Sequence, residues 1–218
     1  MTFPVSALQG VKPLEGRRAV LALVLLIFSV SVVNWYWDLS ERFAFYSGEW
    51  SKVTMEGTSA LSVGMCGRLV SYALVHGDPA HLVGNLVLFW IFGVTLCDIV
   101  GWRWFLVVFV LSTAGGAAGQ LWTTPASFAP MVGASGAVTG FAGAYFTLYL
   151  KKRRPDPAVW PIAHPIEPGR LVILALAGVV MDLYGVFGIA QEGYSNVAYG
   201  AHLGGFASGA LIMLFRLE

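Results

Sequence analysis

Six apolar stretches constrain this chain more than any other feature of its sequence. Each is long enough to cross a lipid bilayer as a helix, because about 20 residues span a hydrocarbon core of about 30 Å. Only 11% of the residues are charged and 57% are hydrophobic, which excludes an ordinary soluble domain. We therefore predict an all-α membrane protein, a six-transmembrane helical bundle. The predicted spans are about 19–37, 82–100, 105–122, 132–150, 171–189 and 197–217.

The first two spans are separated by a long mixed segment, residues 38–80. It is too rich in aromatic and aliphatic residues for a disordered linker, and charges interrupt it too often for a span. We predict a structured first loop that lies partly embedded in the membrane interface, although an ordinary loop outside the membrane is the alternative. Residues 1–18 are predicted to be a cytoplasmic N-terminal segment, and 19–217 form one six-span core.

Lysine and arginine decide the orientation of such a bundle, because cytoplasmic loops carry an excess of both. If the N-terminus lies inside and the six spans alternate, the basic residues divide unequally between the two sides. The prediction is therefore N-in and C-in. The net charge of +1 suggests no nucleic-acid partner. The inner side would hold Lys12, Arg17, Arg18, Arg103, Lys151, Lys152, Arg153, Arg154, Arg170 and Arg216, and the outer side Arg42, Lys52 and Arg68.

Four polar residues fall at the outer ends of spans two, four and six under this topology. His81 and Asn85 lie in the first turns of span two, Ser135 in the first turn of span four, and His202 early in span six. A rise of about 1.5 Å per residue puts all four within roughly 10 Å of the outer boundary. Polar side chains at that depth need partners inside the protein. They could simply join helices by hydrogen bonds, but four at one depth favour a chemical site.

The chemistry that these residue types allow is acyl transfer. A serine hydroxyl becomes a nucleophile when neutral histidine takes its proton. Small residues around His202 would let span six press against span four. Asn85, His81 and the Ser135 backbone N–H could supply donors for an oxyanion. Two histidines on separate spans, without cysteine or converging carboxylates, make a poor metal site, so no metal is predicted.

Three short motifs in chain order resemble those of the rhomboid family of intramembrane serine proteases. One is a Gly-x-Ser-Gly at the head of the fourth span, one a His-x4-His-x3-Asn leading into the second, and one a His-x2-Gly-x3-Gly in the sixth. Each motif is weak alone, but three on the appropriate spans are specific. The residues concerned are His76, His81 and Asn85, then Gly133, Ala134, Ser135 and Gly136, then His202, Gly205 and Gly209.

The resemblance implies a Ser–His dyad with no acidic third member and no cofactor. Ser135 would be the nucleophile and His202 the general base, and Ser135, Asn85 and His81 would form the oxyanion hole. His76 would tie down the first loop. The implied substrates are transmembrane proteins in contact with membrane lipids. The compact core favours a bacterial inner membrane, and the oligomeric state is left open. A catalytically silent rhomboid-like protein that binds membrane clients is the alternative.

Two positions depart from the family pattern. Where many members carry a tyrosine that packs on the catalytic histidine, this chain has Thr139, so His202 must be oriented by another group, such as Phe141 or span two. Gly67 replaces the tryptophan of a Trp-Arg pair in the first loop. Asp182 lies inside span five, where a carboxylate is costly. It could orient His202, or equally face water or a lipid headgroup, and it receives no catalytic role from the sequence.

Overall fold

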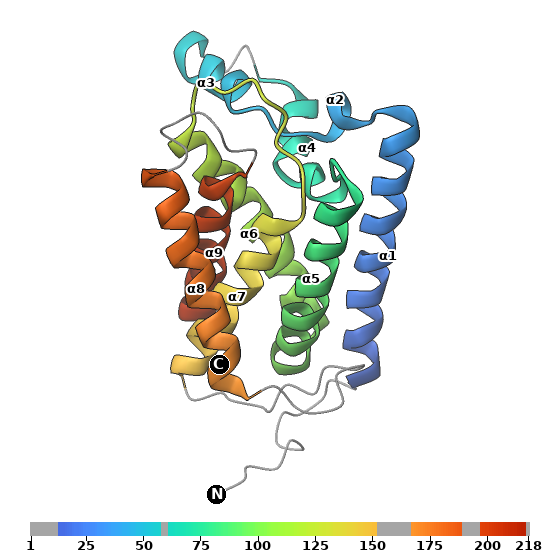
Figure 1. Cartoon of the computed structure of the whole chain (residues 1–218), viewed down its shortest axis with the longest axis vertical. Coiled ribbons are helices and arrows are strands. Elements are labelled where there is room, and N and C mark those ends of the chain that lie inside the picture. Colours follow the sequence, from blue (N-terminus) through green and yellow to red (C-terminus); the bar gives the residue numbers. More distant parts are fainter. Residues whose placement is uncertain (1–12, 58–60, 152–166, 189–196, 217–218) are drawn as a thin grey trace, which may run out of the picture.

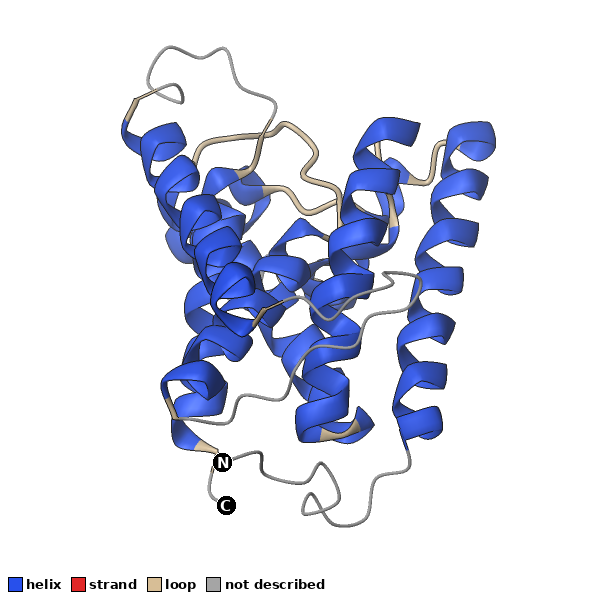
Figure 2. Ribbon diagram, turned by 60° about the horizontal axis from the view of Figure 1, so that its bottom comes forward, coloured by secondary structure: helices blue, strands red, loops and turns tan. Residues whose placement is uncertain are grey.

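The computed structural model describes residues 13–57, 61–151, 167–188 and 197–216, and the regular elements in these ranges are helices (Figure 2). Predictions for the remaining residues, including most of the basic run after Lys151, lie outside the described ranges. The helices are α1 Pro13–Trp37, α2 Ser40–Phe43, α3 Ser47–Glu56, α4 Val63–Ser71, the 3₁₀ turn η3 Tyr72–Leu74, α5 Pro79–Val100, α6 Trp102–Thr123, α7 Ser135–Leu150, α8 Pro168–Phe187 and α9 Tyr199–Phe215.

Each of the six predicted spans corresponds to one long helix. Four helices are long and apolar enough to cross a membrane by themselves: α1 from Arg17, α5, α6 and α8. The other two, α7 with 16 residues and α9 with 17, reach only about 25 Å at 1.5 Å per residue. The all-helical membrane fold agrees with the sequence prediction, whereas the count of six spans stays a prediction.

Helix α7 lies at the centre of the bundle, packed against α5, α6, α8 and α9, while α1 stands at the edge beside α5 (Figure 1). Its middle contributes Phe141 to an aromatic cluster with Phe89, Phe105 and Phe109. Helices α7 and α9 run parallel, because Gly136 faces Ala201 at their starts and the Lys151 ammonium donates to the carbonyl oxygen of Met213 at their ends. The starts of α7 and α9 are thereby brought to the same level.

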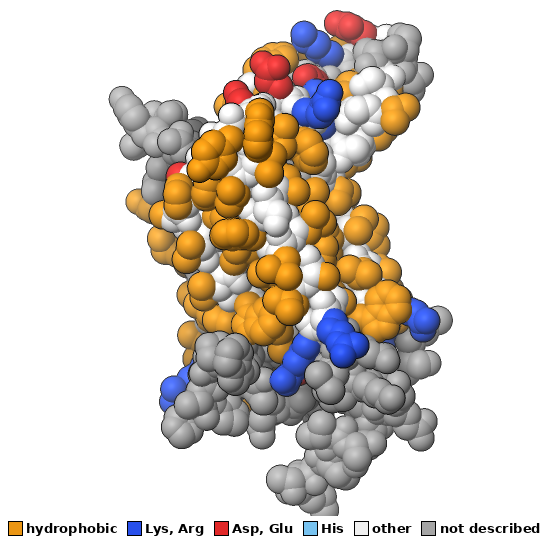
Figure 3. Space-filling model, turned by 90° about the vertical axis from the view of Figure 1, so that its right-hand side faces the viewer, with side chains coloured by type: hydrophobic (Ala, Val, Ile, Leu, Met, Phe, Trp, Pro, Cys, Tyr) orange, Lys and Arg blue, Asp and Glu red, His pale blue; other side chains and the backbone are white. Residues whose placement is uncertain are grey.

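On the face of the bundle that Figure 3 shows, hydrophobic side chains form a belt between two ends that carry charged side chains. Large hydrophobic side chains that the helices leave exposed include Leu25, Phe28 and Val107. Among the described residues, the basic side chains predicted to lie inside gather at the end where α1 begins, for example Arg17, which pairs with Asp98 at 3.4 Å. A solvent as apolar as lipid suits such a belt. The direction in which the bundle crosses a membrane remains a prediction.

The first loop is structured, as predicted: α2, α3, α4 and η3 cover the opposite end of the bundle (Figure 1). Tyr72 anchors it, because this side chain is 1% exposed and its hydroxyl donates to the carbonyl oxygen of Thr113 on α6 at 2.8 Å. Paired backbone bonds between Phe45 and Met131 join the loop to the segment that leads into α7. That the loop lies partly in the membrane interface stays a prediction.

Candidate active site

The start of α7 is fixed by the first loop. Gly133 donates its backbone N–H to the carbonyl oxygen of Tyr72 at 3.0 Å, and Ala134 donates its own to Nε2 of His76 at 3.2 Å. Gly133 has a φ of +117°, a backbone conformation that glycine adopts readily and residues with a side chain rarely adopt. Ser135 then begins the helix, half-buried. Two hydrogen bonds from consecutive N–H groups therefore set the position of the serine.

Close packing sets His202 at the same level on the neighbouring helix. A Cβ on Gly136 would lie 3.5 Å from the carbonyl oxygen of Ala201, the residue before His202. A Cβ on Gly205, one turn later, would overlap the carbonyl oxygen of Gly136. Gly209 meets Gly140 in the same way one turn further along. The predicted small-residue contact between these helices is thus present at Gly205 and Gly209, whereas Gly200 and Gly204 pack against α6. Ser135 and His202 stand on facing first turns.

His81 and Asn85 converge on the chain just before Ser135. A Cβ on Gly133 would lie 2.7 Å from Cε1 of His81 and 3.7 Å from Nδ2 of Asn85. Asp78 accepts the His81 backbone N–H at 2.8 Å and so caps α5. The structure therefore brings the predicted donors to one side of the helix start that carries the serine.

His76 joins three segments through one buried ring. Because Nε2 accepts from Ala134, the neutral ring carries its proton on Nδ1 and donates to Ser31 Oγ of α1 at 2.9 Å. The carbonyl oxygen of His76 accepts from the indole N–H of Trp35 at 2.8 Å. The side chain is fully buried. These bonds fit the predicted role of tying down the first loop.

His76 should make stability depend on pH. Burial lowers the pKa of His76 to about 3, from an ordinary 6.5. Between these values the unfolded chain binds a proton that the native chain does not, so stability falls as pH drops from about 6.5 towards 3, by up to about 1.4 kcal/mol per pH unit. His76→Gln should flatten this slope. Thermal unfolding in detergent at several pH values tests it, and equal slopes for both proteins would contradict the assignment.

Arg68 supports the first loop without the family's tryptophan. Its guanidinium pairs with Glu49 at 2.7 Å and lies over the ring of Tyr46, 5.4 Å from the centroid. These contacts tie α4 to α3 and to the chain before it. Nothing lies within 4 Å of a Cβ placed on Gly67. The loop is therefore held by Arg68 and Tyr72, although Gly67 leaves an open position.

The imidazole of His202 contacts Asp182, for which orienting this ring was one of the alternatives that the sequence left open. Nδ1 of His202 lies 2.7 Å from Oδ1 of Asp182 on α8, and the two side chains are 17% and 10% exposed. Of the groups suggested above, Phe141 lies in the aromatic cluster and does not hold the ring. The Thr139 hydroxyl donates to its own helix at Ser135 and Gly136. The resemblance implied no acidic partner for His202, but the structure places the Asp182 carboxylate against its ring.

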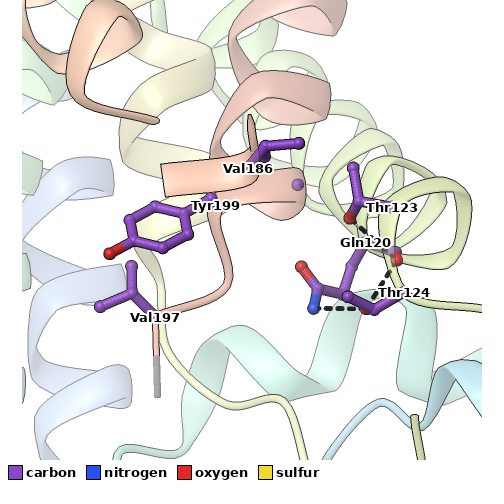
Figure 4. A pocket seen from close by; sticks show the side chains of 7 residues that line it. Gln120, Thr123, Thr124, Val186, Val197 and Tyr199 are labelled. Carbon is purple, nitrogen blue, oxygen red and sulfur yellow. Dashed lines mark hydrogen bonds between the residues drawn. The ribbon is translucent and has the colours of Figure 1, made fainter. Parts of the chain in front are cut away.

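A pocket lies beside the start of α9, between the ends of α6 and α8 (Figure 4). The amide of Gln120 donates to the hydroxyl of Thr124 along its rim at 2.8 Å. Neither Ser135 nor His202 lines it, so it is separate from the site above. Its lining consists of Gln120, Thr123, Thr124, Val186, Val197, Tyr199 and Gly200. Among the described residues, no cluster of three or more His, Cys, Asp or Glu side chains could hold a metal ion.

The fold defines a helical integral membrane protein, and polar side chains gather at the covered end of its bundle. The family model of the rhomboid domain matches residues 63–218, more than half of the chain. The chain therefore belongs to the rhomboid family.

Two curated relatives agree with this assignment. Rhomboid protein 1, mitochondrial, of Saccharomyces cerevisiae is 28% identical over 147 residues, 66% of this chain and 40% of its own length. Rhomboid-related protein 2 of Mus musculus is 32% identical over 143 residues, 64% of this chain and 45% of its own length. Each match thus spans less than half of the relative. Because both relatives are eukaryotic, the bacterial inner membrane stays a prediction.

Proposed function

We propose that this chain is an intramembrane serine endopeptidase that hydrolyses peptide bonds in or near transmembrane segments of other membrane proteins. The observation that supports it most is that Ser135 and His202 lie on the facing first turns of α7 and α9, with His81 and Asn85 beside the chain that enters α7. Membership of the rhomboid family raises the same expectation. The hydrophobic belt suits a protein whose substrates reach it through lipid.

In the first step Ser135 Oγ attacks the carbonyl carbon of the scissile peptide bond. Nδ1 of His202 is engaged by Asp182, so Nε2 is the nitrogen left to take the hydroxyl proton. An Oγ–C bond forms and the carbonyl electrons move to oxygen. The Ser135 N–H at a helix start, an Asn85 amide N–H and the His81 imidazole are the proposed donors to this oxyanion.

In the second step the C–N bond breaks, and the proton on His202 Nε2 passes to the leaving amine. An acyl group then remains on Ser135. Water replaces the amine, gives its proton to the same nitrogen, and attacks the ester carbon. Collapse of this second oxyanion returns the proton to Ser135 Oγ and releases the new carboxyl terminus.

Labelling with a fluorophosphonate probe tests the nucleophile. The full chain in detergent micelles should be labelled on Ser135, because the probe reacts with serines activated by a base. Ser135→Ala should reduce labelling to background. Ser112→Ala is the matched control, since Ser112 is a buried serine on α6 whose hydroxyl has no hydrogen-bond partner in the structure, and it should label as wild type does.

The same experiment separates the alternative function. A catalytically silent protein that binds membrane clients would need neither an activated serine nor a free His202 Nε2. Well-folded wild-type protein that shows no labelling, and no cleavage of transmembrane substrates in a mass-spectrometric comparison with Ser135→Ala, would favour the client-binding alternative over the protease.

A further inference from the structure

Asp182 is an acidic residue on the buried side of an otherwise apolar helix. The residues that α8 buries form one stripe, Leu171, Ala175, Asp182 and Gly185. An aspartate in such a span is costly to insert into lipid, and a buried carboxylate is retained only with a partner. Among the described contacts of Asp182 is the imidazole of His202, 20 positions away along the chain and on a different helix.

The contact has the geometry of a strong, charge-assisted hydrogen bond. Its length of 2.7 Å lies at the short end of the range for N–H···O bonds to a carboxylate. An ionised carboxylate can only accept, so the proton of the neutral ring lies on Nδ1. The ring is then held in one tautomer and one orientation, and its Nε2 carries the lone pair that a general base requires.

Within the described part of the chain, the residue at the family's tyrosine position does not take this place. Thr139, at the position where many family members carry a tyrosine, donates its hydroxyl to the carbonyl oxygens of Ser135 and Gly136 at 3.0 and 3.1 Å. It is therefore committed to its own helix. Both Asp182 and His202 are largely shielded from water, at 10% and 17% side-chain exposure, which strengthens the interaction between them.

We propose that Asp182 is a positioning residue that makes this site a Ser–His–Asp arrangement instead of a dyad. Resting on the proposed function, this inference adds a third member that acts through His202 and does not touch the substrate. Asp182 holds the imidazole towards Ser135 while it is neutral, and it stabilises the positive charge that develops when Nε2 takes the serine proton.

A purely structural role for Asp182 is the competing explanation, because α8 also contacts α9 through Tyr199. A Cβ on Gly185, three residues after Asp182, would lie 2.5 Å from the ring of Tyr199, three residues before His202. Asp182 could thus matter only as a second packing contact between α8 and α9. Tyr199→Ala removes the contact between Gly185 and the Tyr199 ring and leaves the Asp182–His202 bond in place, so it serves as the matched control.

The test measures fluorophosphonate labelling rate, kcat and KM for the full chain in proteoliposomes containing a transmembrane substrate. Asp182→Asn keeps the size but removes the charge, and it should lower kcat and labelling rate by at least about 100-fold, with KM within about twofold. Asp182→Glu should recover part of both rates because the carboxylate is restored. Tyr199→Ala should label within about threefold of wild type.

Three outcomes would overturn the inference. One is Asp182→Asn retaining kcat within threefold of wild type. Another is an equal loss of labelling in Asp182→Asn and Tyr199→Ala, which would assign Asp182 to helix packing. The third is a wild-type protein that is not labelled at all, in which case the proposed function fails first. If Asp182→Asn does not fold, Asp182→Glu is used in its place. A labelling rate of Asp182→Glu no higher than that of Ser135→Ala would then contradict the positioning role.

Discussion

Alanine at Ser135, alanine at His202, and both together should each lower the turnover of a transmembrane substrate by the same factor, on the order of 10⁶. The reason is that a nucleophile and its base act as one unit, so removing the second costs nothing more once the first is gone. Steady-state cleavage in proteoliposomes, compared at equal amounts of folded protein, measures this. The expectation rests on the facing first turns of α7 and α9.

The expectation would be contradicted if the loss of turnover in the double variant were the product of the losses in the two single variants. If the double variant were slower than either single variant by a further large factor, Ser135 and His202 would contribute independently, as two helix-joining side chains would. Ser112→Ala, a change of the same size at a buried serine of α6, controls for a general effect on the bundle. It should keep turnover within about threefold of wild type.

The sequence was sufficient for the helices and for the level of the polar residues within the bundle. Apolar runs of about 20 residues allow little except helices in lipid, because every backbone group must then be satisfied within its own segment. A fixed rise per residue converts position in a run into depth. That is why Ser135 and His202, each near the start of its run, stand on facing turns.

The partner of His202 could not be read from the sequence. Depth follows from counting residues, but the rotation of each helix about its own axis depends on packing against all its neighbours. Asp182 was visible as a costly carboxylate in span five, yet its direction is set by the stripe through Leu171 and Ala175 that α8 buries. The late start of α7 was equally hidden, because backbone bonds between Phe45 and Met131 hold the preceding segment extended.

Gly209→Leu should disrupt the bundle more than any other single change considered, lowering the thermal midpoint by about 10 °C or preventing assembly. A Cβ there would overlap the backbone carbonyl of Gly140, which cannot rotate away as a side chain could. Overfilling a packed core costs about 1–3 kcal/mol or more, and here it would also separate the helices that carry Ser135 and His202. Gly178→Leu on α8 is the matched control, since nothing lies within 4 Å of its Cβ position. Unfolding in detergent followed by loss of fluorophosphonate labelling measures both effects, and equal midpoints for the two leucine variants would show that close approach of α7 and α9 does not hold the site together.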